Sequence, residues 1–163
     1  MSQPEVSGRE KALELLRSFE TAMMVTHAPS GPLDCRPMHV AQVEPDGSVM
    51  FFASAESHVT LHVRKDARVL LVMQDAHDRY VSLFGRASVL ADRERVEGLW
   101  REDYRRWFPE GVDPRDLVLL VVNPDYAEYW DRSGMDKLRY LFDKAPTNAE
   151  GLEAGAQHGR VKL

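Results

Sequence analysis

Cysteine is nearly absent from this sequence, and Cys35 is the single example. An intramolecular disulfide is therefore impossible, and no CxxC pair is present to hold a structural zinc ion. A basic surface for nucleic acid is missing too, because the formal net charge is −5 and Lys and Arg are scattered among Asp and Glu. These absences favour a protein of the reducing cytoplasm without a nucleic-acid partner.

Long apolar runs are also missing. No uninterrupted run approaches the ~20 residues of a membrane-spanning helix, and residues 1–11 have no apolar signal-peptide core. We therefore expect neither a membrane span nor export. Neither a GxGxxG fingerprint nor a P-loop occurs, which disfavours a Rossmann or kinase-type nucleotide site.

The histidines do not form a recognisable catalytic or metal-binding motif. His58 and His62 are spaced to share a helix face, but no HExxH carboxylate accompanies them, so we predict no metal site. His27 and His39 fall on adjacent predicted strands without a Ser or Cys nucleophile signature beside them. No catalytic residue is therefore predicted.

The sequence does contain enough apolar residues for one domain, 44% of 163 positions. Ser7 and Glu10 form a capping box that predicts a helix over Arg9–Ser18. Helical spacing predicts two more helices, over Ser57–Lys65 and around Asp92–Trp100. Short apolar segments between turn-forming residues predict strands. The expected strands are Ala22–Thr26, Arg36–Val43, Val49–Ala53, Ala67–Gln74, Arg79–Leu90, Leu117–Val122 and Ala127–Asp131, the last two being separated by Asn123-Pro124.

These strands predict a mainly β domain of the α+β class. Several antiparallel strands with short helices at the corners indicate a barrel or a sandwich, since closure protects sheet edges. Gly85 marks a bulge or a close backbone approach within its strand. The tail over residues 145–163 has few periodic hydrophobic residues, so we expect it to be loosely ordered behind a core over residues 8–144.

Two groups of motifs make this pattern specific. The first is Arg36-Pro37-Met38, followed by Phe51-Phe52-Ala53-Ser54 and a short helix. The second is Trp107-Phe108-Pro109-Glu110-Gly111 with the later Tyr129-Trp130-Asp131. Over most of the chain, this arrangement resembles the general stress protein branch of the pyridoxamine 5'-phosphate oxidase-like FMN-binding split-barrel family. The resemblance implies an antiparallel split β-barrel with short peripheral helices, working as a homodimer with two flavins at its interface.

In that family the isoalloxazine ring of FMN lies along the second strand, at positions matching Arg36 to Met38. The resemblance implies that main-chain groups near Pro37 face the ring while the Arg36 guanidinium reaches the flavin's polar tail. It also implies that Tyr80 approaches the partner's cofactor and that Trp107 serves packing and the flavin pocket together. The implied cofactor-binding residues are Arg36, Pro37, Met38, Phe52, Ala53, Ser54, Ser57, His58, Val59, Tyr80 and Trp107.

The phosphate site departs from the family's pattern. Members usually have Thr where this chain has Ala53, and Lys, often preceded by Arg, where it has His58-Val59. One hydroxyl donor and one fixed positive charge are therefore missing, at about 1.5–3 kcal/mol for each charge-assisted hydrogen bond. Ser54, Ser57 and the amides at the helix N-terminus remain as donors for an anion. FMN is thus expected, with weakened affinity.

The resemblance implies a flavin-dependent oxidoreductase that exchanges electrons with an unidentified small molecule, the cofactor supplying the redox chemistry. The alternative, which Ala53 and Val59 favour, is a flavin-binding or flavin-free stress protein without turnover. Pyridoxamine-phosphate oxidase activity is disfavoured, because the tail has only His158, Arg160 and Lys162 and no basic cluster for a second phosphate. Haem binding on this fold needs a positioned histidine, and no histidine stands out as one.

Overall fold

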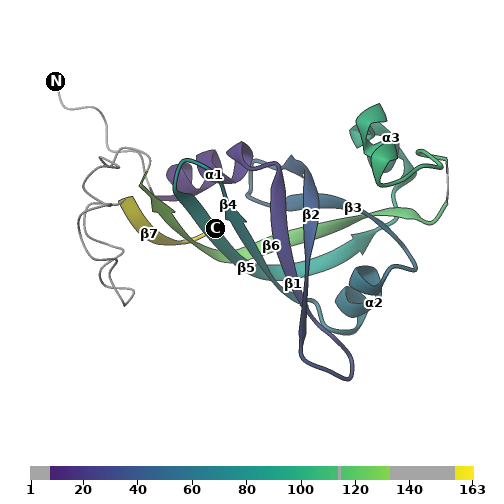
Figure 1. Ribbon diagram of the computed structural model, residues 1–163, viewed down its shortest axis with the longest axis horizontal. Helices are drawn as coiled ribbons and strands as arrows, with labels where there is room; N and C mark the ends of the chain where they lie inside the picture. The colour runs from purple at the N-terminus through teal and green to yellow at the C-terminus, as the bar shows by residue number, and fades with distance from the viewer. Residues whose placement is uncertain (1–7, 114, 133–156) are drawn as a thin grey trace.

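The computed structural model describes residues 8–113, 115–132 and 157–163. Its elements follow the expected order closely (Figure 1). The helices in the described part are α1 (Gly8–Ser18), α2 (His58–Lys65), α3 (Arg93–Leu99) and a short 3₁₀ helix, η1 (Glu102–Arg106). The strands are β1 (Thr21–His27), β2 (Leu33–Val43), β3 (Val49–Ser54), β4 (Arg68–Gln74), β5 (Arg79–Leu90), β6 (Leu117–Asp131) and β7 (Gln157–Lys162).

The strands form one antiparallel sheet in the order β3-β2-β1-β4-β5-β6-β7, and β6 also pairs with β3. This additional pairing closes β1 to β6 into a barrel and leaves β7 outside the closed ring, beside β6. The length of β6 makes closure possible, because its first part pairs with β3 while most of its length pairs with β5. The expected mainly β split barrel is confirmed.

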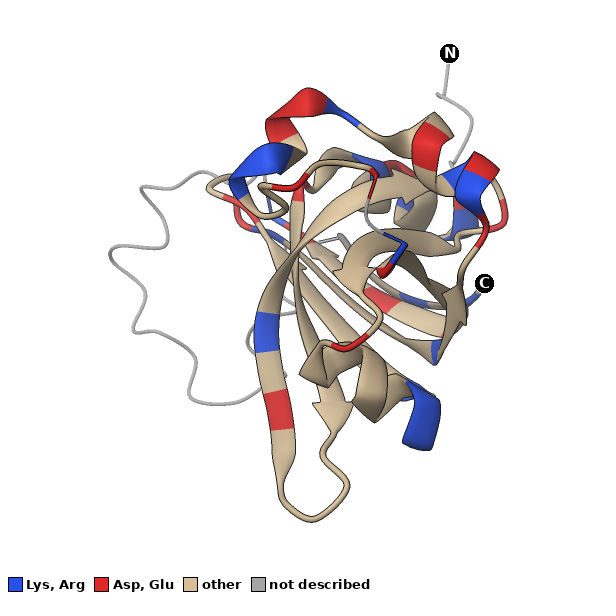
Figure 2. Ribbon diagram, turned by 90° about the vertical axis from the view of Figure 1, so that its right-hand side faces the viewer, with Lys and Arg blue, Asp and Glu red and all other residues tan. Residues whose placement is uncertain are grey.

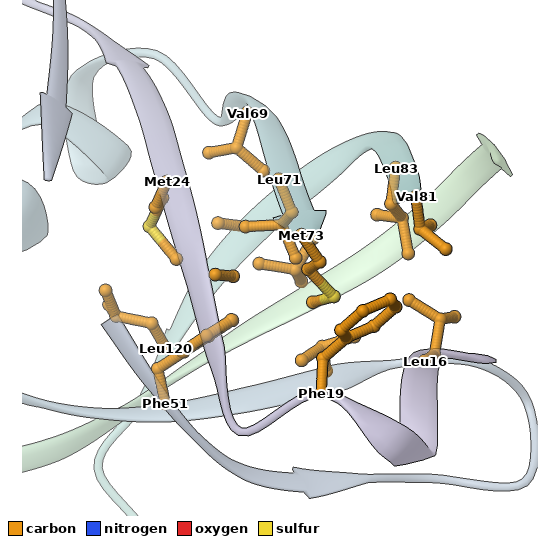
Figure 3. Close-up of a cluster of buried hydrophobic side chains, with 14 of the residues drawn as sticks. Leu16, Phe19, Met24, Phe51, Val69, Leu71, Met73, Val81, Leu83 and Leu120 are labelled. Atoms are coloured by element: carbon orange, nitrogen blue, oxygen red, sulfur yellow. The ribbon is translucent and has the colours of Figure 1, made fainter. Parts of the chain in front are cut away.

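Alternate side chains of the strands fill the barrel interior. Met24, Phe51 and Leu71 are fully buried and converge from different strands (Figure 3). Leu16 of α1 and Phe19 belong to the same core and cover one end of it. Burial of each such side chain contributes about 1.5–3 kcal/mol, so this cluster dominates the stability of the fold. Helix α2 lies at the opposite end of the barrel from α1 (Figure 1), and polar groups gather there.

A second buried cluster covers the outer face of β3 and β6. Met50 and Phe52 alternate along β3 with core residues and pack under α3 and η1. Val96 of α3 and Tyr104 of η1 are buried against them. Both faces of β3 are therefore covered, which explains why its sequence is a continuous apolar run rather than an alternating one.

The expected break at Asn123-Pro124 is wrong, because β6 continues through both residues. Pro124 is tolerated there because β6 changes neighbours around it, pairing with β3 as far as Val122 and with β7 from Tyr126. The pairing with β5 is also irregular at this point. The missing N–H of proline therefore falls where the ladder is already interrupted.

Gly85 lies opposite this irregularity, and its expected bulge is confirmed. The register between β5 and β6 shifts between Phe84 and Gly85. A β-carbon at Gly85 would lie 2.2 Å from the carbonyl oxygen of Asn123. The two backbones approach so closely that a side chain at this position would force them apart.

Part of the tail is ordered, contrary to expectation. Residues 157–162 form β7, which pairs with β6 between Tyr126 and Asp131. Val161 and Leu163 pack against the main core. Pairing covers the free edge of β6, and this long-range gain is invisible in the local composition of the tail. The rest of the predicted loose segment, residues 145–156, lies outside the described residues.

Candidate functional site

Arg36 is the centre of a polar cluster at the α2 end of the barrel. Its Cα pairs with that of Met24, a core residue of β1, so its side chain starts from the inner face of the barrel. Nη1 donates to the Met24 carbonyl oxygen at 3.2 Å and to Thr26 Oγ1 at 2.7 Å, and Nη2 lies 2.7 Å from Asp34 Oδ2. Groups from β1 and β2 thus fix the guanidinium together.

His62 of α2 completes this cluster. Its Nδ1 lies 3.0 Å from Thr26 Oγ1 and 3.9 Å from Asp34 Oδ2. Since Thr26 Oγ1 accepts from Arg36, its own proton is available to donate to Nδ1 of a neutral imidazole. The hydrogen bond and positive charge of Arg36 hold the pKa of the Asp34 carboxyl below its usual value, so Asp34 is ionised at neutral pH.

The N-terminus of α2 supplies further polar groups to the same end of the barrel. Ser57 caps the helix, accepting from the Thr60 amide at 3.4 Å and donating to the Ser54 carbonyl oxygen at 2.8 Å. His58 opens the helix, and its ring stacks on that of His62 with centroids 6.4 Å apart. Two imidazoles and the helix N-terminus therefore adjoin the Arg36 cluster.

These donors suit an anionic phosphate such as the one that ends the FMN tail. Arg36 Nη2 is buried, and its partner among the described residues is the Asp34 carboxylate, 2.7 Å away. A phosphate oxygen would have to take the place of this carboxylate, or share the guanidinium with it, as the charged acceptor. Arg36, His58 and His62 are the side chains that fit the group.

Ala53 and Val59 contribute packing rather than donors. They are 4% and 8% exposed and belong to the main core. Their side chains carry no polar atom, so the hydroxyl and the ammonium group that the family usually supplies here have no replacement at these positions. The Ser54 hydroxyl is also engaged, since it donates to Asp116 Oδ2 at 2.9 Å. Of the side chains matched to the phosphate site, Arg36 is therefore the one with a fixed positive charge.

The next part of β2 carries the segment matched to the flavin ring. Pro37 is exposed on the outer face of the sheet, and Met38 packs inward against the core. His39 follows, and Trp107 stacks on it with ring centroids 5.0 Å apart and planes 25° apart. Trp107 is 47% exposed, so it leaves a broad indole surface beside this strand.

Phe52 and Tyr80 lie apart from the Arg36 cluster. Phe52 is buried in the outer cluster, with its ring centroid 5.2 Å from that of Tyr104. Tyr80 is on β5, and two strands, β1 and β4, separate it from β2. One chain does not bring Tyr80 to Arg36, and contact with a partner's cofactor stays a prediction.

Sequence reasoning missed Thr26 and Asp34, and it left His62 out of the cofactor-binding residues although it placed His62 either at the surface or on the cofactor side. The signal lies in the hairpin register, which places Thr26 opposite Asp34 and Met24 opposite Arg36. A two-residue offset on one face of a hairpin brings these side chains together. The contribution of His62 depends on how α2 packs on β1, and that contact leaves no sequence pattern.

A family model described as "Pyridoxamine 5'-phosphate oxidase like" matches residues 8–153. The chain belongs to this family. Its fold is shared by general stress proteins of the family, as the resemblance predicted. A search of the curated proteins finds no match.

Three solved structures illustrate the likeness. A protein related to general stress protein 26 from Clostridium acetobutylicum has a TM-score of 0.68 and 16% identity, with 94% of this chain and 92% of that chain covered. General Stress Protein 26 from Bacillus anthracis has a TM-score of 0.66 and 19% identity, covering 74% and 92%. A protein assigned to the general stress family from Xanthomonas campestris has a TM-score of 0.64 and 27% identity, covering 81% and 91%. These neighbours share the fold of this chain, the fold that its resemblance to general stress proteins implied.

Other kinds of site find no support in the described residues. No helix among them is long and apolar enough to cross a membrane. Within the same residues, no three His, Cys, Asp or Glu side chains are grouped so that they would hold a metal ion. Acidic and basic positions are interspersed over the face shown in Figure 2.

Proposed function

We propose that this protein binds FMN between two subunits and acts as a flavin-dependent oxidoreductase on a small molecule. The observation that carries the proposal is the guanidinium of Arg36, which Thr26 and Met24 fix at the α2 end of the barrel and whose other terminal nitrogen faces the Asp34 carboxylate. A pre-positioned planar fork of donors is the feature that binds phosphate with both charge and geometry. The family to which the chain belongs adds support.

Each part of the site has a physical task. Arg36, aided by His58, His62 and the N-terminal amides of α2, would hold the phosphate. The backbone of β2 next to Pro37 would lie against the ring, and the Trp107 indole would shield it from water. FMN supplies the electron transfer when bound, so no acid or base in the chain is required for that step.

A second copy of the chain completes this proposal. The outer face of β1, β2, β4 and β5 exposes large apolar side chains, with Met23 at 40%, Leu33 at 60%, Val72 at 38% and Tyr80 at 37%. Met23 and Val72 are paired neighbours on this face, and exposed apolar residues that gather on one sheet face indicate a protein interface. A homodimer through this face would cover them and would bring Tyr80 of one subunit toward the cofactor of the other.

The test is a titration of the purified protein with FMN, followed by flavin absorbance and fluorescence. Wild-type protein should bind in the micromolar range, and Arg36→Gln should weaken binding at least tenfold because it removes a charge-assisted pair. Arg68→Gln is the matched control, since Arg68 is exposed and paired with Asp66 at the start of β4. An absence of wild-type binding at several hundred micromolar FMN would refute the proposal.

That outcome would favour the second candidate, a flavin-free stress protein without turnover. The structure gives this candidate a specific basis. Asp34 already neutralises Arg36, and Ala53 and Val59 fill core positions without offering donors. In such a protein, the Arg36 cluster would serve to join β1, β2 and α2.

A further inference from the structure

A groove that does not include the residues of the Arg36 cluster lies beside Trp107. This groove of about 510 Å³ runs between the end of α1 and η1, and residues 39–43 of β2 form its floor. Arg17 comes from α1, while Arg101 and Arg106 come from the segment around η1. Elements far apart in the sequence therefore bring three guanidinium groups to one groove.

The side chains that line the groove carry more positive than negative charge. Its carboxylates are those of Glu20 and Asp103, against three arginines. Asp103 Oδ1 is 3.4 Å from Arg101 Nε, a loose pair. Among the described residues, no carboxylate lies within ion-pair distance of Arg17 or Arg106. The groove therefore has an excess of one positive charge, which suits a singly charged anion.

Arg106 is held in place for such a ligand. Its Cζ lies 4.6 Å from the centroid of the Trp107 ring, and its Nε donates to the Asp103 carbonyl oxygen at 3.2 Å. Trp107 in turn stacks on His39. A stacked arginine keeps the donors at its edge available, and both terminal nitrogens of Arg106 lack a hydrogen bond to any described residue. The stack on Trp107 thus orients the terminal N–H donors of Arg106 and leaves its positive charge unneutralised.

The groove begins where the flavin-lining segment ends. His39, on its floor, directly follows Met38 on β2, and Trp107 lines the groove as well as the predicted flavin pocket. A molecule with its acid group on Arg106 would extend from there toward the exposed outer face of Pro37. Such a molecule would lie next to the ring of FMN if that ring rests on β2.

We propose that this groove binds the carboxylate group of a small organic acid, and that such acids are the substrate class of the protein. The second half of this statement rests on the proposed flavin function, whereas the anion site does not. The arginine fork would bind the carboxylate in a bidentate manner. The stacked Trp107 would limit the width of the molecule that enters.

The test uses benzoate as a small planar carboxylate and benzamidine as a cation of the same shape, added to ¹⁵N-labelled full-length protein. Benzoate should shift the Nε–H signal of Arg106 and the indole N–H signal of Trp107 in a saturable way, while benzamidine should not. Arg106→Gln and Arg17→Gln should each weaken benzoate binding several-fold. Arg68→Gln, on a different part of the surface, should leave it unchanged.

Equal shifts with benzamidine, or benzoate binding that survives in Arg106→Gln, would overturn the anion site. An FMN titration of the same wild-type sample separates the two proposals. If the wild-type protein does not bind FMN but still shows benzoate shifts that depend on Arg106, the flavin function and the substrate assignment are overturned. The anion site is supported in that case. FMN binding without any benzoate shift would overturn the anion site alone.

Discussion

Thr26 Oγ1 accepts a hydrogen bond from Arg36 Nη1 at 2.7 Å and lies 3.0 Å from Nδ1 of His62. One buried hydroxyl therefore links β1, β2 and α2 at the end of the barrel where the phosphate is proposed to bind. A buried hydroxyl with two partners is costly to remove, because both partners are left without a hydrogen bond.

Thr26→Val should test this linking role. The substitution keeps the shape of the side chain and removes the hydroxyl, so Arg36 loses a fixing contact. We expect the free energy of unfolding to fall by about 1–3 kcal/mol and FMN affinity to fall roughly five- to thirtyfold. Urea denaturation and flavin titration measure the two effects. Thr26→Ser retains the hydroxyl and should restore most of the affinity; equal losses in both variants would contradict the role of the hydroxyl.

Gly85→Ala should destabilise the closed barrel. Its β-carbon would lie 2.2 Å from the Asn123 carbonyl oxygen, a backbone atom that cannot rotate away. We expect a loss of at least about 2 kcal/mol in the free energy of unfolding, measured by chemical denaturation. Gly98→Ala in α3 is the control, since a β-carbon there meets nothing within 4 Å and should be neutral or stabilising by up to ~1 kcal/mol. Similar effects at both glycines would show that the close approach is absent.

Gly85 and Pro124 show which features of the fold the local sequence can predict. Gly85 interrupts an alternating strand pattern, so its bulge was predictable, and turn-formers such as Pro29 and Gly47 set most strand ends. The continuity of β6 through Pro124 was not predictable, because it depends on where two other strands begin and end. The composition of a strand does not reveal which other strands will pair with it.

The same distinction applies to the candidate site. Arg36 was identified through the motif that it opens, and the structure places its guanidinium among Met24, Thr26 and Asp34 at the α2 end of the barrel. Its partners Thr26 and Asp34 follow from the register of the β1–β2 hairpin. That register depends on the conformation of the turn at residues 28–32, which the sequence does not specify. The groove that joins Arg17 to Arg106 depends on the packing of α1 and η1 over β2, and no spacing in the sequence records that packing.

Lys11 and Asp131 form an ion pair that joins α1 to β6. Nζ lies 2.8 Å from Oδ2, and the hydrogen bond from Asp131 raises the pKa of Lys11 above its ordinary value. A raised folded pKa means that the stabilisation is complete below the unfolded pKa, near ~10.4, and is lost as pH rises through the folded value. Lys11→Met should therefore lower the free energy of unfolding by about 1–3 kcal/mol at pH 7 and by much less at a pH above the raised pKa of the folded protein.

Urea denaturation at both pH values measures this difference. Lys65→Met, at the exposed end of α2, serves as the control and should change stability little at either pH. A loss in Lys11→Met that is the same at neutral and high pH would assign the effect to apolar packing of the lysine stem instead of its charge.

The proposed dimer face makes a prediction about assembly. Met23 and Val72 are paired neighbours on β1 and β4, and both are exposed. A charge at the centre of an interface is costly to bury, so Val72→Glu should shift the protein from dimer to monomer in sedimentation velocity at micromolar concentration. Leu61→Glu, at an exposed apolar residue of α2, should leave the dimer intact. A wild-type monomer, or dissociation by both variants alike, would argue against this face.

Asp34 offers the sharpest test of the phosphate site, because it is expected to oppose the ligand. Its carboxylate lies 2.7 Å from Arg36 Nη2, and the arginine keeps the pKa of Asp34 below its usual value. An incoming phosphate must therefore compete with a permanent negative charge at neutral pH. Asp34→Asn keeps the shape and removes the charge, so FMN affinity should rise about three- to tenfold in the flavin titration. Asp66→Asn, which leaves Arg36 untouched, should not change it. A fall in affinity in Asp34→Asn would mean that the carboxylate positions Arg36 for the phosphate and does not compete with it.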